Sequence, residues 1–95
     1  MTETTLLDFM NRNTFSEYAA IMNSVDMQAF FKDVRIISIY IGVNKNDSKR
    51  AIVIFQGAER VCFDTFNKLE NRLAIESTGH IYNETLISRC VTSSI

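Results

Sequence analysis

The spacing of hydrophobic positions along the chain changes between a strand-like and a helix-like period. Residues 35–43 and 50–56 are β-branched and aromatic almost throughout, which is typical of β-strands, and the polar residues 44–49 between them predict a hairpin. Residues 4–10 predict a first strand, in which apolar and polar positions alternate imperfectly. Residues 80–91 predict the last strand.

A helix is predicted after the first strand. Thr14 and Glu17 have the spacing of a capping box, in which the Thr14 hydroxyl accepts a hydrogen bond from the Glu17 amide and the Glu17 carboxylate accepts one from the Thr14 amide. An apolar stripe follows and ends at Met22, and the next stripe begins five positions later, out of phase with the first. We therefore expect a kink just after Met22, with Ser24 or Asp26 as the new N-cap.

A long second helix is predicted over residues 58–75, opened by Gly57. Asp64 and Lys68 have the spacing of a favourable i,i+4 ion pair on this helix. Gly79 suits the left-handed position that follows the end of a helix. The apolar stripe of this helix is expected to consist of Cys62, Phe66, Leu69 and Leu73.

The predicted elements follow the order strand, helix, strand, strand, helix, strand. Short domains with this order commonly fold as the split β-α-β, ferredoxin-like sandwich. The sequence therefore predicts an α+β fold with a four-stranded antiparallel sheet and both helices on one face. Residues 1–95 are expected to form this α+β domain as a single unit.

The predicted central hairpin is apolar on both of its faces. An antiparallel sheet with one solvated face alternates apolar and polar residues, whereas both alternate sets in residues 35–43 and 50–56 are mainly apolar. Because two helices cover only one face, we expect a second copy of the chain to cover the other, as a homodimer. The more polar set, assigned to the dimer interface, is Ile36, Ser38 and Tyr40; the set assigned to the helix side is Ile37, Ile39 and Ile41.

Composition and charge restrict the possible partners. The chain has 95 residues, 46% apolar and 22% charged, and its 10 Lys and Arg against 11 Asp and Glu give a net charge of −1. This near balance argues against an electrostatic surface for nucleic acid or an anionic membrane. No apolar run is long enough to span a bilayer, and the acidic N-terminus lacks the apolar core of a signal peptide, so we expect a cytoplasmic protein.

The sequence predicts neither a metal site nor a cofactor. Cys62 and Cys90 are the only cysteines, too few for a structural zinc site or a disulfide scaffold. No Gly-rich phosphate loop is present. Cys62 lies on an apolar stripe, where a thiol behaves as a small hydrophobe, and we interpret it as a core residue rather than a nucleophile.

Several segments resemble a small family of cyanobacterial proteins. These segments are residues 40–47 (YIGVNKND), 52–56 (IVIFQ) and 76–81 (ESTGHI), followed by Thr85 and residues 87–88. The family is similar to the dimeric α+β barrel proteins, which include cofactor-free monooxygenases, stress-responsive barrel proteins and haem-degrading enzymes. The resemblance implies a homodimeric barrel and no particular activity. Its relatives often carry a histidine just before the glutamine of the third strand, where this chain has Phe55.

His80 is the only histidine, so every function that needs an imidazole depends on it. In a functional role, His80 is a proton carrier or a haem ligand. In a structural role, it begins the last strand, and a lone histidine is more often structural. A cavity between the sheet and the helices is a second candidate site. The residues predicted to line it are His80, Tyr40, Gln56, Phe55 and Tyr82. In the alternative interpretation, the aromatic side chains fill the core and the glutamine ends a strand.

Three functions are compatible with the sequence. The preferred one is a homodimeric domain that binds a small molecule or a partner, or acts in stress physiology, without catalysis. The alternatives are a cofactor-independent monooxygenase-like enzyme acting on an aromatic substrate and a haem-binding barrel that uses His80. Because one fold hosts many activities, the fold by itself does not choose among them.

Overall fold

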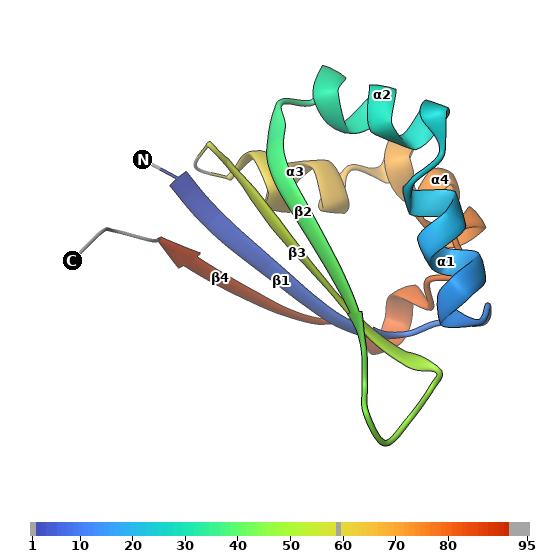
Figure 1. Cartoon of the computed structure of the whole chain (residues 1–95). Coiled ribbons are helices and arrows are strands. Elements are labelled where there is room, and N and C mark those ends of the chain that lie inside the picture. The colour runs from blue at the N-terminus through green and yellow to red at the C-terminus, as the bar shows by residue number, and fades with distance from the viewer. Residues whose placement is uncertain (1, 59, 92–95) are drawn as a thin grey trace.

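The computed structural model describes residues 2–58 and 60–91 (Figure 1). Strands and helices follow one another as β1 (Thr2–Met10), α1 (Phe15–Met22), α2 (Val25–Asp33), β2 (Ile36–Val43), β3 (Arg50–Ala58), α3 (Val61–Asn67), α4 (Arg72–Ser77) and β4 (Leu86–Val91). Two 3-10 turns, η1 (Leu69–Asn71) and η2 (Tyr82–Glu84), precede α4 and β4. The predicted order of elements is confirmed, with each predicted helix divided in two.

The strands form one antiparallel sheet in the order β2-β3-β1-β4. The helices lie together on one side of this sheet, and the described part of the chain places none on the other side (Figure 1). The prediction of a ferredoxin-like α+β fold is therefore confirmed. β1 and β3 are central, and β2 and β4 form the two edges.

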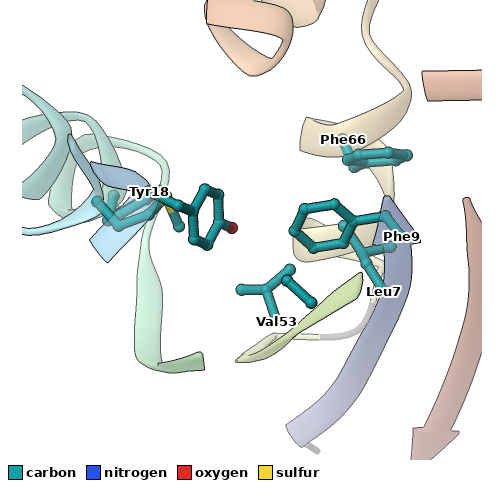
Figure 2. Packing of buried hydrophobic residues seen from close by; sticks show 8 residues of the cluster. Leu7, Phe9, Tyr18, Val53 and Phe66 are labelled. Carbon is teal, nitrogen blue, oxygen red and sulfur yellow. The ribbon is translucent and has the colours of Figure 1, made fainter. Parts of the chain in front are cut away.

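Alternate residues of β1 supply the centre of the core. Leu7 and Phe9 point toward the helices and are 1% and 0% exposed, and the register pairs Leu7 with the buried Val53 of β3. Figure 2 shows these three side chains facing Tyr18 of α1 and Phe66 of α3. Because strand side chains alternate between faces, Thr4, Leu6, Asp8 and Met10 of β1 point to the uncovered side of the sheet.

Thr14 caps α1 as predicted. Its hydroxyl accepts a hydrogen bond from the Glu17 N–H at 3.2 Å, and the Glu17 carboxylate accepts one from the Thr14 N–H at 3.2 Å. These hydrogen bonds lower the pKa of Glu17 because they stabilise its ionised form. The helix is then interrupted, and Ser24 caps α2 by accepting a hydrogen bond from the Met27 N–H at 3.3 Å. The capping box and the kink are confirmed, with Ser24 as the new cap.

A β-bulge in β2 changes which residues face the helices. The register with β3 shifts so that Ile36 pairs with Gly57 and Ser38 with Gln56. Ile36 packs against the core on the helix-covered face, while Ile37 is 70% exposed. The sequence placed Ile36 on the uncovered face and Ile37 toward the helices. Both placements are wrong, because an extra residue in the strand reverses the alternation on one side of the bulge.

The helix predicted over residues 58–75 is shorter and broken. Gly57 does not open a helix, because β3 continues through it to its last residue, Ala58. α3 begins at Val61, and Lys68 then adopts an extended conformation with φ −67° and ψ 126°. This single extended residue separates α3 from η1 and α4. The apolar spacing alone therefore overestimated the length of the helix.

The break turns two predicted core residues outward. The side-chain amide of Asn71 donates a hydrogen bond to the Thr65 carbonyl at 2.9 Å, which satisfies a backbone group near the end of α3. Leu69 and Leu73 were predicted on the buried stripe, but each is 81% exposed. The prediction is wrong for these two leucines, because the stripe assumed one continuous helix.

The same break changes the partner of Asp64. Its carboxylate lies 3.2 Å from the Arg60 guanidinium, one turn earlier in the chain. Lys68 was predicted to pair with Asp64, but its ammonium lies 3.9 Å from Glu70 instead. Since Lys68 has left the helix, the i,i+4 spacing no longer brings the two side chains together.

The last strand is shorter than predicted because its first residues pack inward. His80 forms an isolated bridge with Asn11, and η2 follows before β4 begins. The Tyr82 ring stacks on Phe66 with ring centroids 4.8 Å apart, and its hydroxyl donates a hydrogen bond to the Phe66 carbonyl. Gly79, with φ +94°, makes the turn before this segment, in the left-handed conformation that was predicted.

Glu3 is a buried charge at the start of β1. Its carboxylate is held by the Arg89 guanidinium of β4 at 2.7 and 2.9 Å and accepts the Arg60 N–H at 3.2 Å. The hydrogen bond from Arg89 is the main reason that the pKa of Glu3 is lowered. A paired carboxylate at this position joins β1 to β4 and to the turn before α3.

We expect the Thr14→Ala variant to lose about 0.5–2 kcal/mol of its free energy of unfolding, because the first turn of α1 loses its cap. Urea denaturation followed by circular dichroism measures this difference. Ser16→Ala, at an exposed position of the same helix turn, is the control and should change stability by less than about 0.5 kcal/mol. Equal denaturation midpoints for both variants would contradict a stabilising capping box.

Candidate functional site

An apolar cavity of about 200 Å³ lies between the sheet and helices α2, α3 and α4. Most of its lining residues are apolar: Met27, Phe30, Phe31, Ile36, Phe55, Cys62, Phe66, Ala74 and Ile75. The polar residues in its wall are Asp26, Thr65 and Asn71. A concave, mainly apolar site with a few polar groups is typical of small-molecule binding.

The helices form this cavity because each presents an apolar stripe to the sheet. The stripe of α2 starts at Met27 and includes Phe31, which is buried. The break after α3 redirects α4, so that Ala74 and Ile75 line the cavity while Leu73 points to solvent. The irregular helix layer therefore leaves an apolar space between itself and the sheet.

A deeper hollow of about 60 Å³ adjoins the cavity. The two spaces share five lining residues, namely Met27, Phe31, Phe55, Phe66 and Ile75. Beyond them, the hollow reaches Tyr18, Thr78 and His80. The interior of the protein thus runs from an apolar cavity to an inner end that carries hydroxyl and imidazole groups.

Tyr18 offers a hydroxyl group to this inner end. The residue is 2% exposed, and its ring meets Phe9 edge-on with centroids 5.5 Å apart. Figure 2 shows the hydroxyl oxygen pointing toward Phe9, into the core. Burial raises the pKa of Tyr18, so the phenol is neutral. No hydrogen-bond partner for this hydroxyl is found among residues 2–58 and 60–91, which leaves it available to a bound molecule.

His80 lies in the wall of the hollow and is 4% exposed. Its ring stacks on Phe9 with centroids 3.9 Å apart, and its Nε2 lies 2.7 Å from the Thr85 hydroxyl oxygen. Burial lowers the pKa of His80 to about 4, against an opposing effect of the Glu76 carboxylate, so the ring is neutral near pH 7. One ring face and one nitrogen are already occupied, which supports the structural interpretation of His80 over the haem ligand.

The structure brings together three of the five predicted ligand-binding residues. Phe55 lines both spaces, His80 lines the hollow, and Tyr82 packs against the same core cluster. Tyr40 and Gln56 lie on the opposite, uncovered face, where Tyr40 is 62% exposed. Phe55 and Gln56 are consecutive strand residues, so their side chains point to opposite faces and do not line one cavity.

Cys62 is 3% exposed and lines the cavity from α3. Burial, and secondarily the Glu3 carboxylate, raise the pKa of Cys62 to about 11. The thiol is therefore protonated near pH 7 and is a poor nucleophile. This geometry agrees with the interpretation of Cys62 as a core residue.

Several lining residues were not proposed from the sequence as site residues. Tyr18, Met27, Phe31 and Phe66 were recognised only as parts of apolar helix stripes. Their spacing at i, i+3 and i+4 gives the same signal whether a stripe fills a core or lines a cavity. Only the packing of the layers distinguishes the two.

In the described ranges, no group of three or more His, Cys, Asp or Glu side chains is placed to hold a metal ion. None of the helices that the structure describes is long and apolar enough to cross a membrane.

The buried state of His80 makes stability depend on pH. The folded chain keeps His80 neutral down to a pKa of about 4, whereas the ordinary histidine pKa is 6.5. Between these values the unfolded chain binds a proton that the folded chain does not, so the free energy of unfolding falls as the pH is lowered. At about 1.4 kcal/mol per pKa unit, His80 accounts for a loss of about 3 kcal/mol.

We therefore expect a His80→Phe variant, which keeps an aromatic ring against Phe9, to lose less stability than the wild type on acidification. Urea denaturation at about pH 7 and about pH 4.5 measures the loss of stability in each protein. Both proteins contain the same carboxylates, so the loss that carboxylate protonation causes is common to the two. Equal losses in the two proteins would show that His80 is protonated in the folded state.

Solved structures with this fold include oxygenases. SnoaB, a cofactor-independent oxygenase from Streptomyces nogalater, matches with a TM-score of 0.66 and 8% identity over 99% of this chain and 95% of its own. A Streptomyces coelicolor monooxygenase in complex with nanaomycin D matches with a TM-score of 0.64 and 12% identity over 98% of this chain and 88% of its own. A dimeric ferredoxin-like protein from an uncultured marine organism matches with a TM-score of 0.55 and 12% identity over 99% of this chain and 91% of its own. At such identities these matches show a shared fold alone.

At the level of sequence, no curated protein matches the chain significantly. A family model described as Domain of unknown function (DUF3764) matches residues 2–92. This match runs from the first residue of β1 to just beyond the last residue of β4. The chain therefore belongs to the DUF3764 family.

Proposed function

We propose that this chain binds a small aromatic molecule in the apolar cavity of each subunit. The observation that carries the proposal is the cavity of about 200 Å³ together with the adjoining hollow of about 60 Å³. Small-molecule sites combine apolar walls with a few polar groups that orient the ligand. Here the unpartnered hydroxyl of Tyr18 is such a group.

The size and walls of the cavity indicate the class of ligand. An apolar cavity of about 150 Å³ accommodates benzene. The larger space here therefore suits a molecule of one or two aromatic rings. Phe31, Phe55 and Phe66 offer ring faces and edges to it, and aromatic pairs of this kind are favourable at offset or edge-on geometries. A polar substituent on the ligand can extend into the adjoining hollow and contact the Tyr18 hydroxyl.

Binding without catalysis is the function that the lining side chains favour. Cys62 is protonated, and His80 is stacked and hydrogen-bonded, so neither is poised as a nucleophile or a general base. A haem requires a pocket larger than the roughly 300 Å³ at which drug-sized sites begin. A monooxygenase-like reaction is the alternative, and it uses the same cavity as its substrate site.

We also propose that the chain forms a homodimer through the uncovered face of the sheet. The large apolar residues that cross-strand pairing places on this face are Leu6, Met10, Tyr40, Ile52, Ile54 and Leu86. Tyr40 and Leu86 are each 62% exposed in the single subunit. A contiguous apolar face of this kind is uncommon on a monomer and is typical of an interaction surface. A self-complementary face is the usual basis of a two-fold symmetric dimer.

Polar pairs within this face support an ordered interface. Asp8 and Arg50 form an ion pair at 2.8 Å, and the Ser38 hydroxyl donates a hydrogen bond to the Gln56 side-chain carbonyl at 2.6 Å. Of the residues assigned to the interface from the sequence, Ser38 and Tyr40 lie on this face, whereas Ile36 packs into the core. The shared fold with a dimeric ferredoxin-like protein is consistent with this proposal.

The cavity is tested with indole, a two-ring probe of suitable size. We expect indole to bind the wild type saturably and to shift the backbone amide resonances of cavity residues in a heteronuclear NMR titration. Ala74→Phe places a ring at the cavity wall and should weaken binding at least about tenfold, or by about 1.4 kcal/mol.

Leu73→Phe is the control, because it places the same aromatic side chain on the same helix at a position that is 81% exposed and does not line the cavity. This variant should bind indole like the wild type. No saturable binding to the wild type, or equal weakening in the two variants, would contradict a ligand site in this cavity.

The dimer is tested by light scattering. We expect a mass of about twice the 10.9 kDa of one chain for the wild type and close to 10.9 kDa for Tyr40→Arg, because a charge within the interface is costly to bury. Val25→Arg is the control, since Val25 is 84% exposed on the helix layer. A monomeric wild type would reject the dimer, and a dimeric Tyr40→Arg protein would reject this face as its interface.

A further inference from the structure

A second, polar pocket of about 100 Å³ lies next to the inner end of the hollow. His80 lines both spaces and so forms part of the wall between them. The pocket is bounded by α4, by the segment after Gly79 and by the residues that follow β1. The side chains that matter in it are those of Arg12, Arg72, Glu76, Tyr82 and Asn83.

Arg12 brings a free positive charge to this pocket. Its backbone is held in place, because its N–H donates a hydrogen bond to the Gly79 carbonyl at 2.7 Å. Its carbonyl accepts a hydrogen bond from the Lys49 ammonium at 3.0 Å. Within residues 2–58 and 60–91, the guanidinium of Arg12 has no ion-pair or hydrogen-bond partner.

Arg72 is held in position with most of its donors unused. Its Nε pairs with the Glu76 carboxylate at 2.9 Å, and its guanidinium lies 4.7 Å from the centre of the Tyr82 ring. Tyr82 is fixed in turn by stacking on Phe66 and by the hydrogen bond from its hydroxyl to the Phe66 carbonyl. Both terminal nitrogens of Arg72 are without a partner in the described part of the chain.

The charges around this pocket are therefore unbalanced. Among the lining residues, Arg12 and Arg72 are two cations, against the single carboxylate of Glu76. The whole chain has a net charge of −1, so a local excess of positive charge does not follow from composition. Like charges gathered in one hollow repel each other, and a bound anion removes that cost.

We propose that this pocket binds a small oxyanion, a carboxylate or phosphate group held between the guanidinium groups of Arg12 and Arg72. Guanidinium groups present paired donors whose geometry matches the oxygen atoms of such groups. The side-chain amide of Asn83 is a further donor at the edge of the pocket. The site is separate from the apolar cavity, so it does not depend on the ligand proposed for that cavity.

The experiment uses the whole chain and two probes, inorganic phosphate and acetate, titrated separately at constant ionic strength in chloride. His80 is the only histidine, so its ring Hε1 proton gives a single, unambiguous NMR resonance that reports directly on the wall of the pocket. We expect a saturable shift of this resonance and of the Ile81 and Asn83 amides with at least one probe. The probe that binds more tightly identifies the group as a carboxylate or a phosphate.

Arg12→Gln is the test variant, because its side chain has no structural contact to lose. It should weaken binding about tenfold or more, as expected for the loss of a charged hydrogen bond. Lys32→Gln removes one positive charge from an exposed position on α2, outside the pocket, and should bind like the wild type. Shifts that do not saturate with either probe, or equal weakening in the two variants, would overturn the proposal and indicate an adventitious ion only.

Discussion

The packing of Phe9 between the sheet and the helices is the interaction on which the rest of this structure depends. Its ring is 0% exposed, meets Tyr18 of α1 edge-on and stacks on His80 after α4. One side chain from the central strand thus ties the first helix and the segment after the last helix to the sheet. Because β1 pairs with both β3 and β4, this contact fixes the position of the helix layer over all of the strands that meet there.

The helices do not cover the sheet completely, and we expect binding at the spaces and the surface that they leave. The extended residue Lys68 ends α3 early, so α4 is a separate helix that encloses an apolar space together with α2 and α3. The inward turn at His80 and Tyr82 closes the inner end of that space and leaves a polar pocket on its other side. A single layer of helices also leaves the second face of the sheet uncovered, with Tyr40 exposed at its surface.

Features that depend on neighbouring residues could be predicted from the sequence. The capping box of Thr14 and Glu17, the cap at Ser24 and the left-handed turn at Gly79 each need contacts within a few positions. The order of strands and helices also follows from local periodicity, and that order restricts a chain of this length to few folds. Part of the site was also predictable, since Phe55 lines the cavity, whereas Gln56, the next residue of the same strand, points to the opposite face.

The sequence by itself determined the class of fold, the start of the first helix, the break that follows it and an apolar character on both faces of the central hairpin. Only the tertiary structure decided that Ile36 faces inward, because that depends on a bulge against β3. It also decided that Tyr82 stacks on Phe66 instead of extending β4, and that His80 meets Asn11 across the chain. These contacts join residues 16 to 69 positions apart, and their energies do not show in local periodicity, which reports only how one segment divides between a buried and an exposed side.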